Sequence, residues 1–372
     1  MRGSRSRGRQ RLVGLLLGFG LLLVGCDGSA LFDLLPPEPP EAQPEAPEEQ
    51  PSTTPEPEQP EEEPSAVPDP QEPEGEPGGG DATGGPFDGT DGFYVPPSQA
   101  ADWVAANPDD PRADVIRGRI AEVPASVWLT GGSGVGDTVE STVAAAAEDG
   151  TVPVLVAYNV PGRDCGQFSA GGANGADAYR AWIDEFAAAI GDRPSIVIVE
   201  PDALAGMDCL SEQNQQDRLD LLRYAVEQFA AAAPNAWTYL DAGHAQWQPA
   251  DVMAGRLEAA GVASARGFAL NVSNHHTTAE NEEYGNEVNA ALGAAVPFVV
   301  DTSRNGNGSN GEWCNPAGRA IGVEPNVHEL GDGLEMELWV KLPGESDGDC
   351  GIGAGTSAGQ FVPDIAFELA GG

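Results

Sequence analysis

The 372-residue chain is strongly acidic, with 59 Asp and Glu residues against 18 Lys and Arg and a formal net charge of −41. This charge argues against nucleic acid as a partner, because contacts to phosphate need clustered Lys and Arg. The length allows one large domain of about 280 residues and a separate N-terminal segment.

Residues 1–26 have the pattern of an export signal. Five arginines precede an apolar run, which leads through small residues to Cys26. The run is too short for a stable membrane-spanning helix. Its end, Leu23-Val24-Gly25-Cys26, resembles the bacterial lipobox, which implies that Cys26 is lipidated and anchors an exported protein to the membrane at the bacterial cell envelope or surface. The alternative is an ordinary signal peptide that contains a cysteine by chance.

The next segment, 27–92, is predicted to be a disordered linker. Residues 27–91 contain 19 Asp or Glu, no Lys or Arg, and frequent prolines. Such a composition cannot bury enough apolar surface to offset the entropy of the chain. At about 3 Å per residue in polyproline geometry, the segment reaches at most on the order of 200 Å. We therefore expect a stalk that precedes a folded domain at 93–372.

Strand-like and helical segments alternate through this domain. Seven runs rich in β-branched and aromatic residues are predicted as strands, at 126–130, 153–159, 195–202, 237–243, 267–274, 297–303 and 336–344. Amphipathic helical patterns lie between most of them, including 177–191, 217–233 and 280–295. Nearly continuous apolar strands that alternate with helices indicate a parallel sheet covered on both faces. Seven such units fit a closed or nearly closed α/β barrel better than a small open sheet.

Polar and aromatic side chains follow each predicted strand. In chain order they are Trp128 and Thr130; Tyr158, Arg163 and Asp164; Glu200 and Asp202; Asp241, His244 and Trp247; Asn271, Asn274 and His275; Asp301 and Arg304; and Lys341, Glu345 and Asp347. In a parallel barrel these strand ends share one face, where active sites lie. Taken alone, Asp202 fits equally well as a helix N-cap at a strand end that reaches water. Several carboxylates with tryptophans around one rim favour a functional site.

Four cysteines remain once Cys26 is set aside. In an exported protein this even number indicates two disulfides, and three pairings are open. Pairing between neighbouring loops is geometrically easiest, and it joins Cys165 to Cys209 and Cys314 to Cys350, each bond beside a candidate carboxylate. The chain has no C-x-x-C pair, so a structural zinc site is not expected.

Lys341 is the only lysine in the chain. Its position near Glu345 and Asp347 suggests a site that needs a compact ammonium group rather than a planar guanidinium. The alternative is that a single lysine has survived by chance.

Carboxylates beside aromatic rings are typical of a carbohydrate site, because sugar rings stack on Trp and Tyr while hydroxyls pair with polar side chains. Hydrolysis of a glycosidic bond needs one protonated carboxylic acid and one carboxylate, whose pKa values the environment must separate. With these features the domain, from residue 93 to 350, resembles glycoside hydrolase family 6, the cellulases of endoglucanase and cellobiohydrolase type. The motifs that carry the resemblance are AYNVPGRDCG (157–166), VIVEPDALA (197–205), YLDAGHAQW (239–247), NVSN (271–274), EWCNPAGRAIG (312–322) and WVKLPGESDG (339–348).

The resemblance implies a distorted, TIM-like, seven-stranded parallel α/β barrel and hydrolysis with inversion of the anomeric configuration. It makes Asp202 the general acid, with Asp164 holding Asp202 protonated by like-charge repulsion and helping to organise the attacking water. Asp347 matches the proposed base, a role that is disputed within the family, where another route runs through water, Asp164 and a serine, here Ser169. The implied substrate-binding residues are Tyr158 and Arg163 beside the cleaved bond; Trp128, Trp247 and Trp313 as stacking platforms; Thr130, His244, Asn274, Lys341 and Glu345 near sugar hydroxyls; and Asp241, which orients the site. Glu200 is expected to support the site rather than to react.

The mode of action is predicted from one loop. Only two residues separate Asp347 from Cys350, whereas tunnel-forming members of the family carry long loops there. The short loop implies an open cleft and cleavage inside chains of cellulose or a related β-1,4-glucan. The alternatives are an exo-acting cellobiohydrolase, an enzyme for another β-glucan or a cell-envelope polysaccharide, and a lipid-anchored polysaccharide-binding protein without catalysis.

We expect a monomer with no cofactor and no metal. The Gly-rich segment 131–137 lacks the lysine of a P-loop. His275 and His276 are adjacent, and no third ligand has convincing spacing from them.

Overall fold

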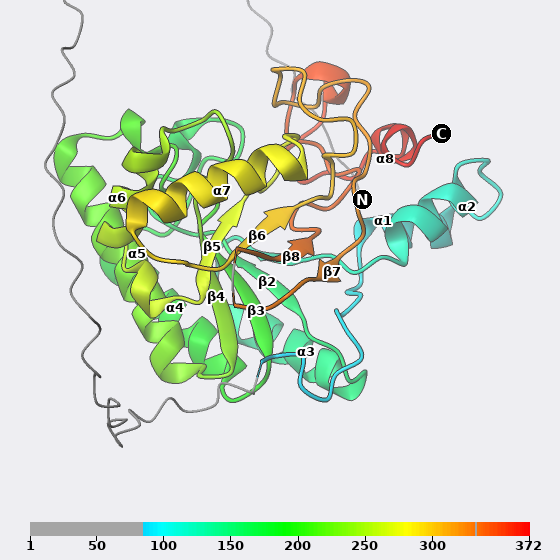
Figure 1. Ribbon diagram of the computed structural model, residues 1–372. Helices are drawn as coiled ribbons and strands as arrows, with labels where there is room; N and C mark the ends of the chain where they lie inside the picture. The colour runs from blue at the N-terminus through cyan, green and yellow to red at the C-terminus, as the bar shows by residue number, and fades with distance from the viewer. Residues whose placement is uncertain (1–84, 332) are drawn as a thin grey trace, which may run out of the picture. The chain divides into compact units, whose positions relative to one another are not determined.

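The computed structural model describes residues 85–331 and 333–372 (Figure 1). The predicted signal segment, Cys26 and the predicted linker up to residue 84 lie outside the described residues. Across the two described segments, no helix combines the length and the apolar character that crossing a bilayer requires.

An eight-stranded sheet forms the centre of the domain, in the order β1-β2-β3-β4-β5-β6-β8-β7. The strands are β1 (Val127–Leu129), β2 (Val154–Ala157), β3 (Ser195–Val199), β4 (Ala236–Asp241), β5 (Gly267–Leu270), β6 (Phe298–Asp301), β7 (Asn326–Val327) and β8 (Leu334–Leu338). All neighbours are parallel except β7, which pairs antiparallel with β8. The seven predicted strands are therefore confirmed as the parallel part of the sheet. The two residues of β7 are too few to give a periodic signal in the sequence.

The sheet curls into a half-barrel that closes only in part. Beyond β8, the carbonyl of Trp339 accepts a hydrogen bond from Ser126 N at 3.0 Å. The carbonyl of Val340 accepts from Ser126 Oγ at 2.5 Å and from Trp128 Nε1 at 2.8 Å. These bonds join the two sides of the curl, although β1 and β8 form no ladder in the part of the chain described here. The expected distorted α/β barrel is confirmed in this partly open form.

The strands are apolar along their whole length because both of their faces are buried. Val156 and Ile198 belong to a cluster made of strand residues from around the curl, which fills its interior. Their neighbours Leu155 and Val197 belong to a second cluster, which packs against the helices. Alternate residues of a strand point to opposite faces, so each predicted strand supplies both layers.

Helices cover the outer face of the sheet (Figure 1). They are α3 (Val135–Glu148), α4 (Ala176–Ile190), α5 (Glu212–Ala232), α6 (Ala250–Ala259) and α7 (Thr278–Leu292). The three helices predicted from periodicity correspond to α4, α5 and α7. Helix α5 begins five residues earlier than predicted because Ser211 caps it. Helix α7 begins with a capping box in which Thr277 and Glu280 each bind the backbone of the other.

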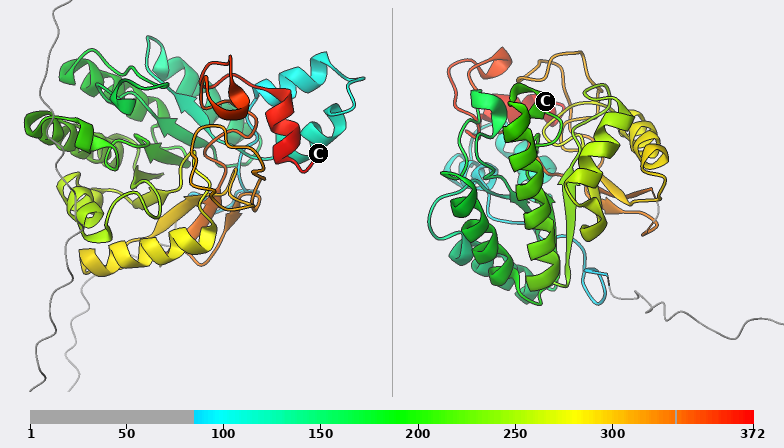
Figure 2. Two further views of the ribbon diagram at one scale, coloured as in Figure 1. Left: turned by 90° about the horizontal axis from the view of Figure 1, so that it is seen from above. Right: turned by 90° about the vertical axis from the view of Figure 1, so that its left-hand side faces the viewer.

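Helices from the two ends of the described chain pack together. Helices α1 (Gln99–Ala106) and α2 (Ala113–Ile116), with the π-helical turn Arg117–Ala121, share a small apolar cluster with α8 (Pro363–Leu369). Figure 2 shows these helices beside one another at one edge of the domain. The preceding residues 85–92, placed by prediction in the linker, also contact the domain, since Asp91 N donates to Gly150 O at 2.7 Å.

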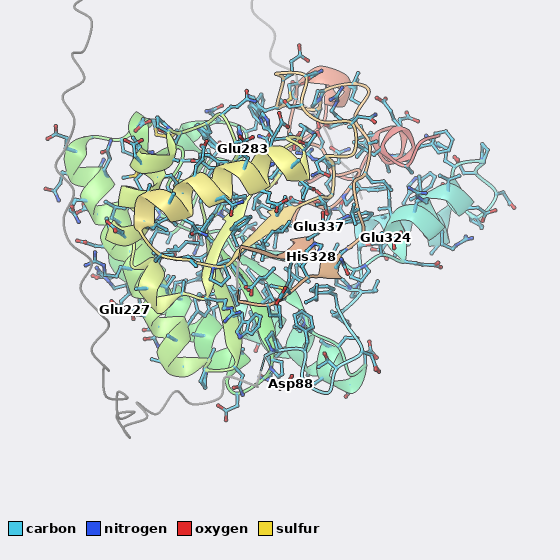
Figure 3. The ribbon with its side chains drawn as sticks, viewed as in Figure 1. Asp88, Glu227, Glu283, Glu324, His328 and Glu337 are labelled. Atoms are coloured by element: carbon cyan, nitrogen blue, oxygen red, sulfur yellow. A yellow bond between two sulfur atoms is a disulfide. The ribbon has the colours of Figure 1, made fainter. Side chains whose placement is uncertain are left out.

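Acidic side chains are spread over the outside of the domain. Glu227, Glu283 and Glu324 are exposed on different elements (Figure 3). Glu337 on β8 is an exception, because it is buried and lies 3.2 Å from His328 Nε2. The acidity therefore extends over the folded surface.

Candidate active site

Left-handed backbone conformations gather at the carboxyl ends of the strands. Positive φ angles occur at Asp164 (54°), Glu200 (52°), Asp202 (67°), Asn271 (65°) and Ser273 (58°). L-residues avoid this region, and such strain is found where a site needs a fixed geometry. The loops after β2, β3 and β5 therefore adopt strained backbone conformations, which direct polar side chains toward one face.

Glu200 is fully buried at the end of β3 and holds the neighbouring loop. Its carboxylate accepts hydrogen bonds from Asn159 N at 2.9 Å and from Val160 N at 2.8 Å. Burial raises the pKa of Glu200 to about 7, although these hydrogen bonds act to lower it. Its oxygens are thus committed to the backbone after β2, as expected for a supporting residue.

Burial and like charge act together on the carboxyl group of Asp202, and they also raise the pKa of its neighbour Asp241. Its backbone N donates to Asp241 Oδ1 at 2.8 Å, which fixes the start of the loop. Burial, followed by the charges of Asp164 and Asp347, raises the pKa of Asp202 to about 7, while Lys341 acts to lower it. Like-charge repulsion from Asp164 is present as expected, but burial contributes more.

Asp164 lies in a loop that is held together by hydrogen bonds between side chains and backbone. Asp164 Oδ2 accepts a hydrogen bond from Ser169 N at 2.5 Å. The guanidinium of Arg163 donates to the carbonyls of Ser169 at 2.9 Å, Thr130 at 2.7 Å and Tyr158 at 2.5 Å. Burial raises the pKa of Asp164, against the opposing effects of Ser169 and Arg163. Arg163 thus secures the loop through backbone carbonyls.

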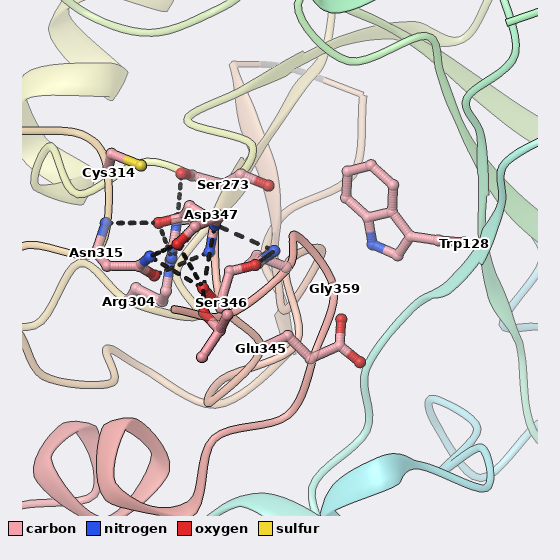
Figure 4. Close-up of polar contacts among 12 residues, drawn as sticks. Trp128, Ser273, Arg304, Cys314, Asn315, Glu345, Ser346, Asp347 and Gly359 are labelled. Carbon is pink, nitrogen blue, oxygen red and sulfur yellow. Dashed lines mark hydrogen bonds and ion pairs between the residues drawn. The ribbon is translucent and has the colours of Figure 1, made fainter. Parts of the chain in front are cut away.

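Asp347 is buried and firmly paired (Figure 4). Both of its carboxylate oxygens lie 2.9 Å from Arg304 Nη1, and Oδ2 also accepts from Asn315 N at 2.9 Å. Burial acts to raise the pKa of Asp347, but Arg304 and Lys341 outweigh it, so the pKa is lowered. The pKa values of two neighbouring aspartates, Asp202 and Asp347, are therefore shifted in opposite directions.

Lys341 and Glu345 lie on the same side of the site as Asp347. Lys341 Nζ is 3.7 Å from Asp347 Oδ1, and burial lowers the pKa of this ammonium group. Its backbone N donates to Asp301 Oδ2 at 2.9 Å, so Asp301 fixes the turn after β8. Glu345 Oε1 accepts from Gln99 Nε2 at 2.7 Å, and burial raises the pKa of Glu345.

Aromatic rings line the rim. Trp128 meets Tyr158 edge to face with centroids 5.2 Å apart, and Tyr158 also lies under the guanidinium of Arg163 at 4.7 Å. Trp247 and Trp313 are exposed for 38% and 47% of their surface, so each offers part of its ring to a ligand. Large exposed rings of this kind are suited to stacking on sugars.

His244 is neutral over most of the pH range. Its ring stacks on His276 with centroids 4.6 Å apart, and burial lowers its pKa to about 4.

The side chain of Asn274 makes a local contact. Its Oδ1 accepts a hydrogen bond from His275 N at 2.8 Å.

Among residues 85–331 and 333–372, no three His, Cys, Asp or Glu side chains converge as metal ligands do.

The two disulfides are those expected from neighbouring loops. Cys165 bonds to Cys209 and Cys314 bonds to Cys350, which confirms the preferred pairing. The first bond joins the Asp164 loop to the loop after β3. The second joins the Trp313 loop to the loop that follows Asp347.

Three residues at the site were missing from the predicted set. Arg304 was noted only as a strand-end residue, yet it is the principal partner of Asp347. Asn315 makes several hydrogen bonds to the loop 346–350, and its signal was its place in the quoted motif at 312–322. Phe168 contacts Trp313, and no pattern in the sequence marks it.

Comparison with known proteins identifies the family. The model of "Glycosyl hydrolases family 6" matches residues 91–371. The chain belongs to family 6 of the glycosyl hydrolases. The predicted family is thereby confirmed, and the chain is a glycoside hydrolase.

Several endoglucanases are similar to this chain over most of the domain. Endoglucanase 1 of Streptomyces halstedii is 50% identical over 287 residues, which cover 75% of this chain and 88% of the relative. Endoglucanase A of Thermobispora bispora is 48% identical over 297 residues, which cover 78% of this chain and 64% of the relative. The structure of the endoglucanase Cel6 from Mycobacterium tuberculosis, in complex with methyl-cellobiosyl-4-deoxy-4-thio-β-D-cellobioside, matches with a TM-score of 0.71 at 43% identity, over 77% of this chain and 98% of that chain.

Proposed function

We propose that this family 6 hydrolase cleaves internal β-1,4-glucosidic bonds of cellulose or a related β-glucan with inversion of configuration. The observation that carries the proposal is that the pKa values of two neighbouring carboxyl groups are shifted in opposite directions. The pKa of Asp202 is raised to about 7, whereas that of Asp347 is lowered. Glycoside hydrolysis needs one carboxyl that holds its proton and one that does not.

Asp202 is the proposed general acid. Its proton passes to the glycosidic oxygen as the bond from that oxygen to the anomeric carbon breaks. A water molecule attacks the anomeric carbon from the opposite face, and it loses a proton to a carboxylate as the new bond forms. The leaving chain end departs as a neutral alcohol, and the acid is restored from solvent.

Asp164 is the carboxylate that we propose to accept the proton from water. Its pKa is raised, it is only half-buried, and Ser169 lies within its loop. Asp347 is a poorer acceptor because its lowered pKa and its pairing with Arg304 hold it in the ionised form. A fixed negative charge in this place suits stabilisation of the positive charge that develops on the sugar ring. We therefore assign Asp347 an electrostatic role.

The substrate-binding roles follow from the exposed rings and from the polar groups around them. We propose Trp128, Trp247 and Trp313 as stacking platforms, with Tyr158 next to the cleaved bond. The residues proposed to contact sugar hydroxyls are Thr130, His244, Asn274, Lys341 and Glu345, while Arg163 and Asp241 position the reacting groups. Endo action is supported by the short loop after Asp347 and by the endoglucanase names of the relatives described above.

The test is release of reducing ends from carboxymethyl-cellulose by residues 85–372, with Asp202→Ala as control. The wild type should release sugar, and Asp202→Ala should release at least about 100-fold less. NMR of fresh products should show inverted configuration, and net retention would contradict the mechanism. If the wild type releases nothing and both proteins bind cello-oligosaccharide alike, the chain is a binding protein. A product pattern of cellobiose alone would indicate an exo-acting cellobiohydrolase.

We also propose that Cys26 is lipidated and becomes the mature N-terminus once residues 1–25 are removed, and that the acidic segment 27–92 tethers the catalytic domain, 93–372, to the bacterial cell envelope. The support is the lipobox-like sequence and the composition of the linker. Mass spectrometry of the mature N-terminus should show a lipid on Cys26, and Cys26→Ser should move the protein from the membrane fraction to the soluble one. The isolated domain should sediment as a monomer.

A further inference from the structure

Two exposed aromatic side chains from different loops of the candidate active site lie against each other. Phe168 and Trp313 are each exposed for 47% of their surface, and their ring centroids lie 6.1 Å apart at an interplanar angle of 54°. Phe168 belongs to the loop after β2, and Trp313 belongs to the loop after β6. Large apolar rings that lie together on a surface often mark a binding site.

The backbone on which each ring is carried is held by a nearby disulfide. Phe168 lies between Cys165, which is bonded to Cys209, and Ser169, whose backbone N binds Asp164. Trp313 directly precedes Cys314, which is bonded to Cys350. Movement is therefore confined to the rings and to the few residues that carry them.

Phe168 also reaches the loop that carries Asp347. A Cβ added at Gly348 would lie 2.7 Å from the ring of Phe168, so this ring occupies the space that any larger residue would need. Gly348 has a φ of 141°, which again only glycine adopts freely. The ring thus bridges the loop of Asp164 and the loop of Asp347.

We propose that Phe168 is a specificity-determining residue, which forms with Trp313 and Gly348 an aromatic clasp that opens to admit a glucan chain and closes over it. This inference rests on the proposed glucanase function. Rings in contact at this distance leave no room for a sugar between them, so a glucan chain that enters displaces Phe168, and the two rings meet again once the chain lies beyond them. An aromatic pair of this kind shifts an equilibrium only about 2- to 10-fold, so the clasp opens readily.

The clasp has a defined consequence for a polymer substrate. A chain interior enters when the rings part, and the closed clasp then slows its departure, so that several cuts follow each encounter. A short oligosaccharide leaves after one cut with or without a clasp. Phe168 therefore affects how long a polymer is held and leaves the chemical step unchanged.

The experiment compares Phe168→Ala with the wild type on regenerated amorphous cellulose. The measured quantity is the ratio of reducing ends released to solution to those left on the insoluble polymer. In Phe168→Ala this ratio should fall about 2- to 10-fold, which is the effect expected from loss of one aromatic pair. The kcat on soluble cellopentaose should stay within about twofold of the wild-type value. Phe168→Tyr keeps the ring and should keep the ratio. Leu330→Ala removes another exposed apolar side chain, 42% exposed, and should also leave the ratio unchanged.

The possible failures are distinguishable. An unchanged ratio in Phe168→Ala, with cellopentaose hydrolysis intact, would overturn the clasp and leave the proposed function standing. An equal loss on cellopentaose and on cellulose would also overturn the clasp, because Phe168 would then act in ordinary substrate binding. If the wild type releases no sugar from either substrate, the proposed function itself fails.

Discussion

Arg304 Nη1 lies 2.9 Å from both carboxylate oxygens of Asp347, and the two side chains are only 3% and 6% exposed. A buried ion pair gives little net stability, but removal of one partner leaves an uncompensated charge. The pair therefore fixes the charge state of Asp347 more than it strengthens the fold.

Asp347→Asn should be both less stable and much less active. The variant keeps the shape of the side chain but leaves the guanidinium of Arg304 without its partner, which should lower the free energy of unfolding by about 3–5 kcal/mol. Loss of a fixed negative charge beside the sugar ring should lower kcat by at least about 100-fold. Urea unfolding and hydrolysis of cellopentaose measure the two effects. Retention of wild-type kcat in a folded variant would refute the electrostatic role of Asp347.

The pH dependence of activity should report the proton on Asp202. Because its pKa is raised to about 7, the acid is protonated below that pH, and kcat/KM should fall as the pH rises through about 7. Lys341 acts to lower this pKa, so Lys341→Met should move the falling limb to higher pH. Lys341→Arg keeps the positive charge and serves as the matched control. A limb that stays in place in Lys341→Met would show that Asp202 does not control it.

Glu200 should make the protein less stable as the pH rises. Its pKa is raised from 4.5 to about 7 in the folded state, so the unfolded chain ionises first. The contribution of the neutral carboxyl to stability is complete below about pH 4.5 and is lost as the pH rises through 7. Glu200→Gln should reduce this fall in the free energy of unfolding, measured by urea titration at several pH values. Asp202 contributes a fall of the same sign, so some dependence on pH should remain.

Glu200→Ala is the harsher variant at the same position. It leaves the buried N–H groups of Asn159 and Val160 without acceptors, which should cost about 2–5 kcal/mol of the free energy of unfolding. A variant of wild-type stability would show that water replaces the carboxylate. The comparison with Glu200→Gln separates the effect of the lost acceptor from that of the lost ionisation.

The sequence was most informative where structure is local. Strand β3 is predicted from four consecutive apolar residues, and Asp202 is predicted to face the site because parallel strands end at one edge. The disulfides followed from the same order of loops. The fold and the carboxylates could be predicted because they depend on short periodic segments and on the ends of those segments.

The contacts between loops could not be predicted in this way. Arg304 and Asn315 reach Asp347 from segments 43 and 32 residues away, and only the folded loops bring them together. Arg163 is predicted to border the sugar. Its guanidinium also donates to the backbone carbonyls of Thr130, Tyr158 and Ser169, and the sequence does not indicate these contacts. Phe168 has no periodic or chemical signature, because its position depends on two loops that meet in space.

Asn315, rather than the adjacent disulfide, should place Asp347. Asn315 N binds Asp347 Oδ2, its Oδ1 accepts from Asp347 N at 2.8 Å, and its Nδ2 donates to Gly348 O at 2.9 Å. The bond between Cys314 and Cys350 spans a sequence separation of 36, and its removal should cost about 4 kcal/mol through the entropy of the unfolded chain. The double variant Cys314→Ala/Cys350→Ala should therefore melt at a lower temperature yet keep kcat at 25 °C within about threefold, a small change in barrier. Asn315→Ala, with the disulfide intact, should lose far more kcat, because it removes the side-chain hydrogen bonds to Asp347 N and Gly348 O that hold the backbone of this loop, although the N–H of residue 315 still reaches the carboxylate. The reverse order of the two losses, measured on cellopentaose with both proteins folded, would show that the covalent link sets the geometry.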